Sequence, residues 1–180
     1  IGISGVSWNT KLLPVRVLGK CGGLVSDIAD GIMWAAGVSV QGVSDNPNPA
    51  DVINLSLGGL GSCGPTLQNA IDKANDKGAV VVVSSGNESY NLDVQEYSPA
   101  NCYGVLTVGA LDKYGDFTQY SNYGEKVDVA APGGDAFDGV FSTYNNGQTS
   151  PDQESYQALN GTSMAAPHVS GVVALIRSLK

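Results

Sequence analysis

The chain has 180 residues, of which 42% are hydrophobic and 14% are charged, so it holds enough apolar material for one packed domain and too much for a disordered tail. Nine basic and seventeen acidic side chains give a formal net charge of −8, which argues against the cationic surface that nucleic-acid binding needs. No apolar run approaches the roughly 20 residues of a membrane span, which argues against a membrane protein.

Apolar runs rich in β-branched residues predict strands, and apolar residues at a spacing of three and four predict helices. In chain order the predicted elements are a strand at residues 12–18, a helix at 25–38, a strand at 52–57, a helix at 65–77, strands at 79–83, 105–110 and 127–130, and a final helix that opens near Ser163 and continues over 169–179. The Gly/Asn/Ser-rich stretch between Asp135 and Gln157 is interpreted as a surface loop or hairpin.

Strands that alternate with helices predict an α/β fold with a parallel sheet. The stretch AVVVV at residues 79–83 is apolar on both faces, as a strand buried between two helical layers would be. Binding sites in such sheets lie at the carboxyl ends of the strands. Two of these ends are polar and glycine-rich, Ser56-Leu57-Gly58 and Ser84-Ser85-Gly86-Asn87, and they are candidate site segments.

The segment from Asn160 to His168, NGTSMAAPH, is the strongest candidate for a nucleophile. Gly161 allows a sharp turn before Ser163, and a helix that starts there offers unpaired N–H donors to a developing oxyanion. The alternative is that Thr162 or Ser163 only caps the helix.

The residues alone supply no base for Ser163. His168 is the only histidine, and five helical residues place it about 140° around the axis from Ser163. An α/β-hydrolase needs its acid and histidine after the serine, and no Asp or Glu follows Ser163. Residue reasoning therefore leaves two possibilities open, part of a serine hydrolase or a capped helix.

Four ordered motifs resemble those of the subtilisin-like serine proteases, and together they span essentially the whole chain. They are VINLSLGG at residues 52–59, VSSGN ending at Asn87, Ala130-Ala131-Pro132-Gly133, and GTSMAAPH at residues 161–168. The resemblance implies a doubly wound, mostly parallel sheet with helices on both faces, of which the N-terminal part is missing. The chain is similar to the secreted bacterial members of this family, which implies a secreted, extracellular protein.

The resemblance assigns a role to each candidate residue. Ser163 would be the nucleophile of an endopeptidase, and Asn87 would donate to the oxyanion together with the backbone N–H of Ser163. The segment Ser56-Leu57-Gly58 would bind an extended protein or peptide substrate as an added strand, and Ser84-Ser85-Gly86 would form the opposite wall of the first specificity pocket.

The family order is Asp, then His, then Ser, so the catalytic Asp and His would come from sequence upstream of Ile1. Residues 1–180 are accordingly interpreted as the C-terminal portion of the catalytic domain, with the upstream part as its partner. The chain alone is predicted to be inactive, because a serine without a base keeps its proton near neutral pH. The alternative function is a catalytically inactive binding or structural module.

The resemblance also implies structural details. A calcium or other cation site would use the carbonyls of Ala100, Cys102 and Val105 with Asp128, and a second calcium loop would include the carbonyls of Ile1 and Ile3. The Ser98–Pro99 peptide bond is predicted to be cis. In a secreted protein with three cysteines, Cys63 and Cys102 are predicted to form a disulfide, and Cys21 would pair with an upstream cysteine.

Overall fold

The structure is a computed structural model that describes residues 4–179. Its centre is a four-stranded parallel sheet in the order β1-β3-β5-β6. The strands are β1 (Val52–Leu55), β3 (Val80–Ser84), β5 (Val105–Leu111) and β6 (Val129–Pro132). The predicted mostly parallel α/β fold is confirmed.

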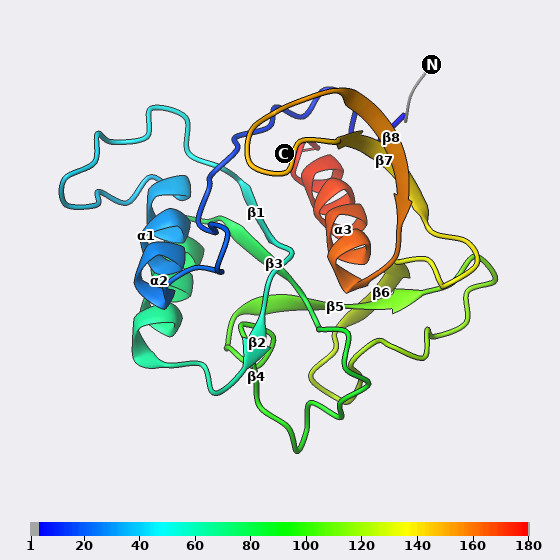
Figure 1. Cartoon of the computed structure of the whole chain (residues 1–180). Helices are drawn as coiled ribbons and strands as arrows, with labels where there is room; N and C mark the ends of the chain where they lie inside the picture. The colour runs from blue at the N-terminus through cyan, green and yellow to red at the C-terminus, as the bar shows by residue number, and fades with distance from the viewer. Residues whose placement is uncertain (1–3, 180) are drawn as a thin grey trace.

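Helices cover both faces of this sheet (Figure 1). On one face, α1 (Val25–Ala35) and α2 (Pro65–Asp76) pack with Val81 and Val83 in one buried cluster. On the other face, Val82 packs with α3 (Thr162–Arg177) in a second cluster. The alternation of Val81, Val82 and Val83 between two apolar layers explains why this strand is apolar on both sides.

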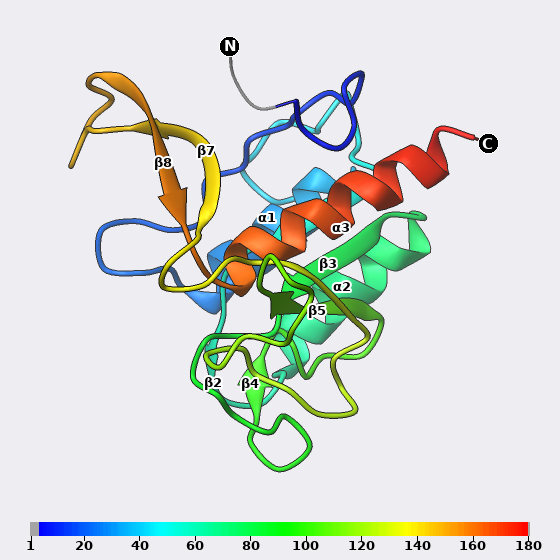
Figure 2. The same cartoon turned by 90° about the vertical axis from the view of Figure 1, so that its right-hand side faces the viewer.

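Two short antiparallel pairs lie outside the central sheet. The strands β2 (Gly59–Leu60) and β4 (Tyr97–Ser98) pair directly beyond the end of β1. The strands β7 (Val140–Asn145) and β8 (Glu154–Leu159) form a hairpin that projects from the body of the molecule (Figure 2). The stretch interpreted as a surface loop or a hairpin is therefore a hairpin, and it lies between β6 and the last helix.

The strand predicted at residues 12–18 is wrong. This segment pairs with no strand among the described residues, and the only bridge near it joins Gly19 and Gly22. Leu12 is 90% exposed, although it belongs to the most apolar part of this run. A strand needs a hydrogen-bonded neighbour, and within residues 4–179 the only strand that pairs with β1 is β3, so no strand of that range lies on the other edge of β1.

Several predicted boundaries also move. The strand predicted at 127–130 starts at Val129, because Val127 N donates to Gly124 O in a turn. The last helix starts at Thr162, next to Ser163, so the predicted helix that opens at the serine motif is confirmed.

Two covalent details agree with the resemblance. Cys63 and Cys102 form a disulfide with a Cα–Cα distance of 5.1 Å, and the Ser98–Pro99 bond is cis. The disulfide joins the loop before α2 to the loop before β5. Cys21 is exposed and has no disulfide partner within residues 4–179. In the same described range, no helix is both long and apolar enough to cross a membrane.

Candidate active site

A tight turn brings the chain into α3 just before Ser163. Gly161 has φ +149°, in the region that favours glycine, and its N–H donates to Gly133 O at 2.9 Å. A Cβ at Gly133 would lie 2.9 Å from Gly161 O and 2.5 Å from the Ala110 side chain. The glycine that ends the Ala130-Ala131-Pro132-Gly133 motif therefore lets the backbone of this turn pack directly on the sheet.

Pro167 frees a carbonyl beside the proposed nucleophile. It lies in the second turn of α3, and it has no N–H to donate to the carbonyl four residues earlier, which is that of Ser163. That carbonyl instead accepts a hydrogen bond from Ser56 Oγ at 2.9 Å. The proline thus allows the segment after β1 to bind the first turn of α3, and the Ser163 hydroxyl in turn lies 3.4 Å from Ser56 O.

Asn87 is held against the residue that precedes Ser163. Its Oδ1 accepts from Thr162 N at 2.8 Å and from Thr162 Oγ1 at 3.0 Å, and the Thr162 hydroxyl accepts from Gly86 N at 3.2 Å. Thr162 is fully buried. These bonds fix the carboxamide oxygen, so the Asn87 Nδ2 group is directed away from Thr162, and no described residue accepts from it.

The first turn of α3 has one backbone donor to spare. Thr162 N donates to Asn87 Oδ1, while Met164 N and Ala165 N both donate to Gly161 O. Ser163 N has no acceptor among the described residues. The two unpaired donors, Ser163 N and Asn87 Nδ2, are the two that the resemblance names for an oxyanion. The hydrogen bonds from Thr162 to Asn87 Oδ1 hold the Asn87 side chain beside the first turn of α3.

Within residues 4–179, no hydrogen bond joins the Ser163 hydroxyl to a histidine or a carboxylate. The ring of His168 bonds through Nδ1 to Met164 O at 2.8 Å, one turn earlier on the same helix. His168 and Ser163 therefore lie on the same helix without contact, as their spacing predicts. The hydrogen bond of His168 is to the helix backbone, which gives this residue a structural role.

The two candidate wall segments follow neighbouring parallel strands. Ser56-Leu57-Gly58 comes after β1, and Ser84-Ser85-Gly86 comes at the end of β3, with which β1 is paired. The serines Ser84 and Ser85 and Gly86 are buried, whereas Asn87 is exposed. The adjacent carboxyl ends bring these segments together at the N-terminal end of α3, as expected for a doubly wound sheet.

Sequence reasoning missed a buried asparagine that braces this region. Asn122 is fully buried, and its Nδ2 donates to Ser85 O at 2.8 Å and to Glu88 Oε2 at 3.0 Å. Its Oδ1 accepts from the backbone N–H groups of Glu88 and Tyr90. Only the Ser121-Asn122 pair in a turn-like context marked this position, and such pairs are typical of ordinary loops.

The implied cation site remains a prediction. Ala100 O accepts from the Thr107 hydroxyl at 3.0 Å, and Asp128 Oδ2 accepts from Thr107 N at 2.7 Å, so both oxygens have protein donors. Within the described range, no group of three or more His, Cys, Asp or Glu side chains is placed to hold a metal ion. The Ile1 and Ile3 carbonyls of the second implied site lie outside the described residues.

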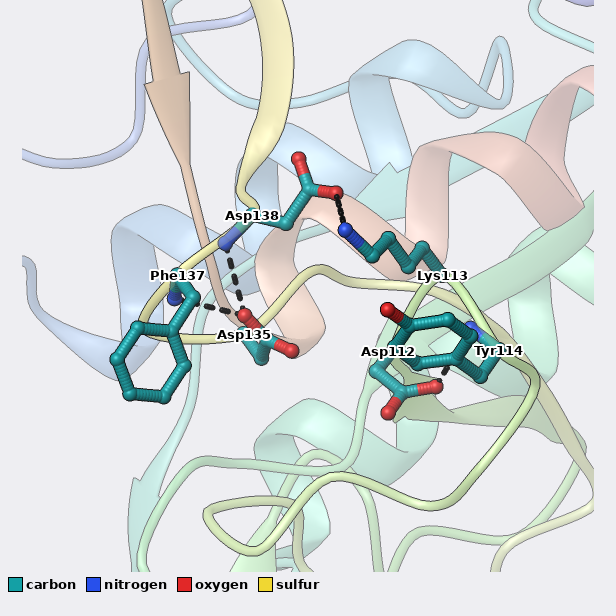
Figure 3. Close-up of polar contacts among 6 residues, drawn as sticks. All are labelled: Asp112, Lys113, Tyr114, Asp135, Phe137 and Asp138. Carbon is teal, nitrogen blue, oxygen red and sulfur yellow. Dashed lines mark hydrogen bonds and ion pairs between the residues drawn. The ribbon is translucent and has the colours of Figure 1, made fainter.

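A cluster of aspartates lies near the start of the hairpin, and internal donors occupy it (Figure 3). Asp135 Oδ1 accepts from the backbone N–H groups of Phe137 and Asp138, and Asp112 Oδ1 accepts from Tyr114 N. The Lys113 ammonium lies 2.9 Å from Asp138, which raises the pKa of that lysine. The ion pair links the loop after β5 to the loop before β7.

Known proteins are similar to this chain along almost its whole length. The extracellular protease of Xanthomonas campestris is 52% identical over 99% of this chain, and the extracellular basic protease of Dichelobacter nodosus is 49% identical over 99% of it. The chain spans 30% and 28% of those two proteins, respectively.

Solved structures show the same fold. A protease from Pseudoalteromonas arctica superimposes with a TM-score of 0.95 at 56% identity, covering 99% of this chain and 54% of that one. A cold-adapted subtilisin-like serine proteinase gives a TM-score of 0.75 at 31% identity, covering all of this chain and 59% of that one. The model of the subtilase family matches residues 1–180, and the chain therefore belongs to the subtilase family.

Proposed function

We propose that the protein is a serine endopeptidase in which Ser163 Oγ attacks the scissile carbonyl of a peptide. The hydroxyl proton passes to a histidine base, the carbonyl oxygen becomes an oxyanion, and the amine leaves with that proton to give an acyl-enzyme. Water then releases the acyl group by the same steps in reverse order.

The pair of unpaired donors at the turn carries this proposal. Ser163 N and Asn87 Nδ2 have no acceptor among the described residues, whereas Thr162 N, beside them, is bonded. Such fixed donors stabilise charge that develops on the carbonyl oxygen, without the reorientation that water would need. A capped helix would also have a free N–H group in its first turn. It would not need a second donor from a side chain 76 residues away.

The substrate would lie along Ser56-Leu57-Gly58 as an added strand, with its first specificity side chain between this segment and Ser84-Ser85-Gly86. The backbone of Gly58 is exposed and can be approached closely. The hydrogen bond from Ser56 Oγ to Ser163 O supports this arrangement, because it ties the substrate segment to the nucleophile's own residue.

The catalytic Asp and His would come from the upstream part of the domain. Two features support a covering partner at this side of the molecule. The β1 edge is open, and apolar side chains of the N-terminal segment, among them Trp8 and Leu12, are exposed. We infer that the upstream part packs there, that Cys21 pairs with a cysteine in it, and that the whole protein is secreted, as the names of the relatives suggest.

Fluorophosphonate labelling of the full-length protein tests the proposal. The wild type should label, and Ser163→Ala should lose the label, because the probe reacts with an activated serine. Asn87→Leu should still label but about 10²- to 10³-fold more slowly, since one oxyanion donor is lost. The 180-residue chain alone should not label.

Two outcomes would contradict the assignment. Labelling that persists in Ser163→Ala would mean that another residue is the nucleophile. A folded full-length protein that neither labels nor cleaves casein would favour the inactive binding module.

A further inference from the structure

An aromatic ring lies between the two segments that would form the first specificity pocket. The β2–β4 pair, next to the end of β1 in Figure 1, places Tyr97 beside Gly58. A Cβ at Gly58 would lie 2.6 Å from Tyr97 Cε1, and a Cβ at Gly86 would lie 2.8 Å from the same atom. One ring carbon therefore touches the backbone of both walls, and only glycine at both positions leaves room for it.

The ring is held in this position at its polar end. Tyr97 OH donates to Glu88 Oε1 at 3.1 Å, and the side chain is only 7% exposed. Glu88 is itself fixed, because its Oε2 accepts from Asn87 N at 2.8 Å and from Asn122 Nδ2 at 3.0 Å. The Tyr97 ring is thus connected through one carboxylate to the backbone of the proposed oxyanion residue.

Burial and the adjacent carboxylate also keep the phenol protonated. Burial, followed by the charge of Glu88, raises the pKa of Tyr97 to about 12. The hydroxyl therefore remains a hydrogen-bond donor throughout the pH range in which the protein would work, and the ring does not leave its place through ionisation.

We infer that Tyr97 forms the floor of the first specificity pocket and restricts the protease to peptide bonds that follow short, uncharged side chains such as alanine and serine. This inference rests on the proposed function, since it concerns the side chain on the acyl side of the bond that Ser163 cleaves. Because one carbon of the Tyr97 ring contacts both walls, the ring closes the bottom of the space between them. A phenylalanine side chain therefore cannot enter fully without moving the ring.

Charged side chains fit the same space less well. An acidic side chain would approach the Glu88 carboxylate, which carries the same charge. A lysine ammonium would be attracted by Glu88, but both oxygens of that carboxylate already accept hydrogen bonds, one of them from Tyr97 OH itself. A preference for lysine is therefore an outcome that would overturn the inference.

The test uses the full-length protein and p-nitroanilide peptides that differ only in the residue before the cleaved bond. The wild type should show a kcat/KM at least about 10-fold higher for alanine than for phenylalanine. Tyr97→Ala should reverse or remove this ratio by opening the gap. Tyr97→Phe keeps the ring and should keep the ratio. Tyr114→Ala, which removes an exposed tyrosine ring after β5, is the matched control and should also keep it.

The ratio separates specificity from stability, because a purely structural role for Tyr97 would lower kcat/KM for all substrates together. Wild-type protein that cleaves after phenylalanine or lysine at least as well as after alanine would overturn the inference even if Tyr97→Ala does not fold. An unchanged ratio in folded Tyr97→Ala would overturn it as well. In either case fluorophosphonate labelling at Ser163 would leave the proposed function standing, whereas loss of both labelling and cleavage would overturn both.

Discussion

The strand β3 and the N-terminal segment at residues 4–24 are both rich in apolar side chains, yet those of β3 are buried and several in the segment are exposed. Val81, Val82 and Val83 are fully buried, whereas Trp8 is 79% and Leu12 is 90% exposed. The difference lies in the neighbours. The strand β3 is hydrogen-bonded on both edges and covered on both faces, while residues 12–18 have no strand beside them among the described residues.

This contrast shows that apolar composition predicts burial only where the chain also supplies a partner. The N-terminal segment does make some contacts, since Val6 lies against Gly171 of α3 and Val17 lies against Gly31 of α1. These contacts anchor the segment without covering it. A well-packed body that carries Ser163 and Asn87 is therefore joined to a segment in which several apolar side chains are exposed.

The largest expected difference between the two regions concerns the cysteines. Replacing Cys63 and Cys102 together by serine should lower the free energy of unfolding by about 4 kcal/mol, because their bond closes a loop with a sequence separation of 39. Urea denaturation of the 180-residue chain under non-reducing conditions measures this.

Cys21→Ser is the matched control, because Cys21 is exposed and lies in the open segment. It should leave the stability of the 180-residue chain unchanged but lower that of the full-length protein, where we propose an upstream partner. A loss of stability in the short chain as well would contradict the contrast between the regions.

A paired truncation of apolar side chains comes next in size. Ile71→Ala removes a fully buried side chain from α2 and should cost about 3 kcal/mol through lost burial and a cavity. Leu12→Ala should change the stability of the 180-residue chain by less than about 0.5 kcal/mol, because that side chain is already in water.

The effect of Leu12→Ala on stability should be larger when the upstream part is present. In the full-length protein Leu12→Ala should cost about 1–2 kcal/mol, since the proposed cover would bury this side chain. Equal small effects in both proteins, measured by the same denaturation experiment, would mean that nothing packs on the segment.

The last comparison is a pH dependence that belongs to the packed region. The pKa of Tyr97 rises from 10.0 to about 12 on folding, mainly through burial and then through Glu88. The folded state thus binds this proton more tightly than the unfolded state. The resulting stabilisation is complete below pH 10 and is lost as the pH rises to 12.

Tyr97→Phe should therefore flatten the fall in stability between pH 10 and pH 12, as measured by thermal unfolding at a series of pH values. Tyr114→Phe is the control, because folding leaves the Tyr114 side chain in solvent. An identical alkaline decline in the wild type and Tyr97→Phe would show that the buried phenol does not control it.

Much of the architecture could be read from local patterns. The apolar run of β3 and the helical spacing of α2 depend on neighbours in sequence, and both elements were predicted within one residue at each end. The four family motifs are also local, so their residues were identified without knowing where they meet. The strand prediction at residues 12–18 is wrong because a strand depends on a partner that no local pattern can reveal.

What the folded molecule alone decided are the contacts between distant segments. The serine motif does not reveal what Pro167 does, and the structure shows that its missing N–H leaves Ser163 O free to accept a hydrogen bond from Ser56, 107 residues away. Likewise, the sequence does not show that the Asn87 side chain binds Thr162. Nor does it show that Glu88 holds the Tyr97 ring between two glycines. Hydrogen bonds and close packing depend on positions in space to within a fraction of an ångström, and only the assembled sheet and helices determine those positions.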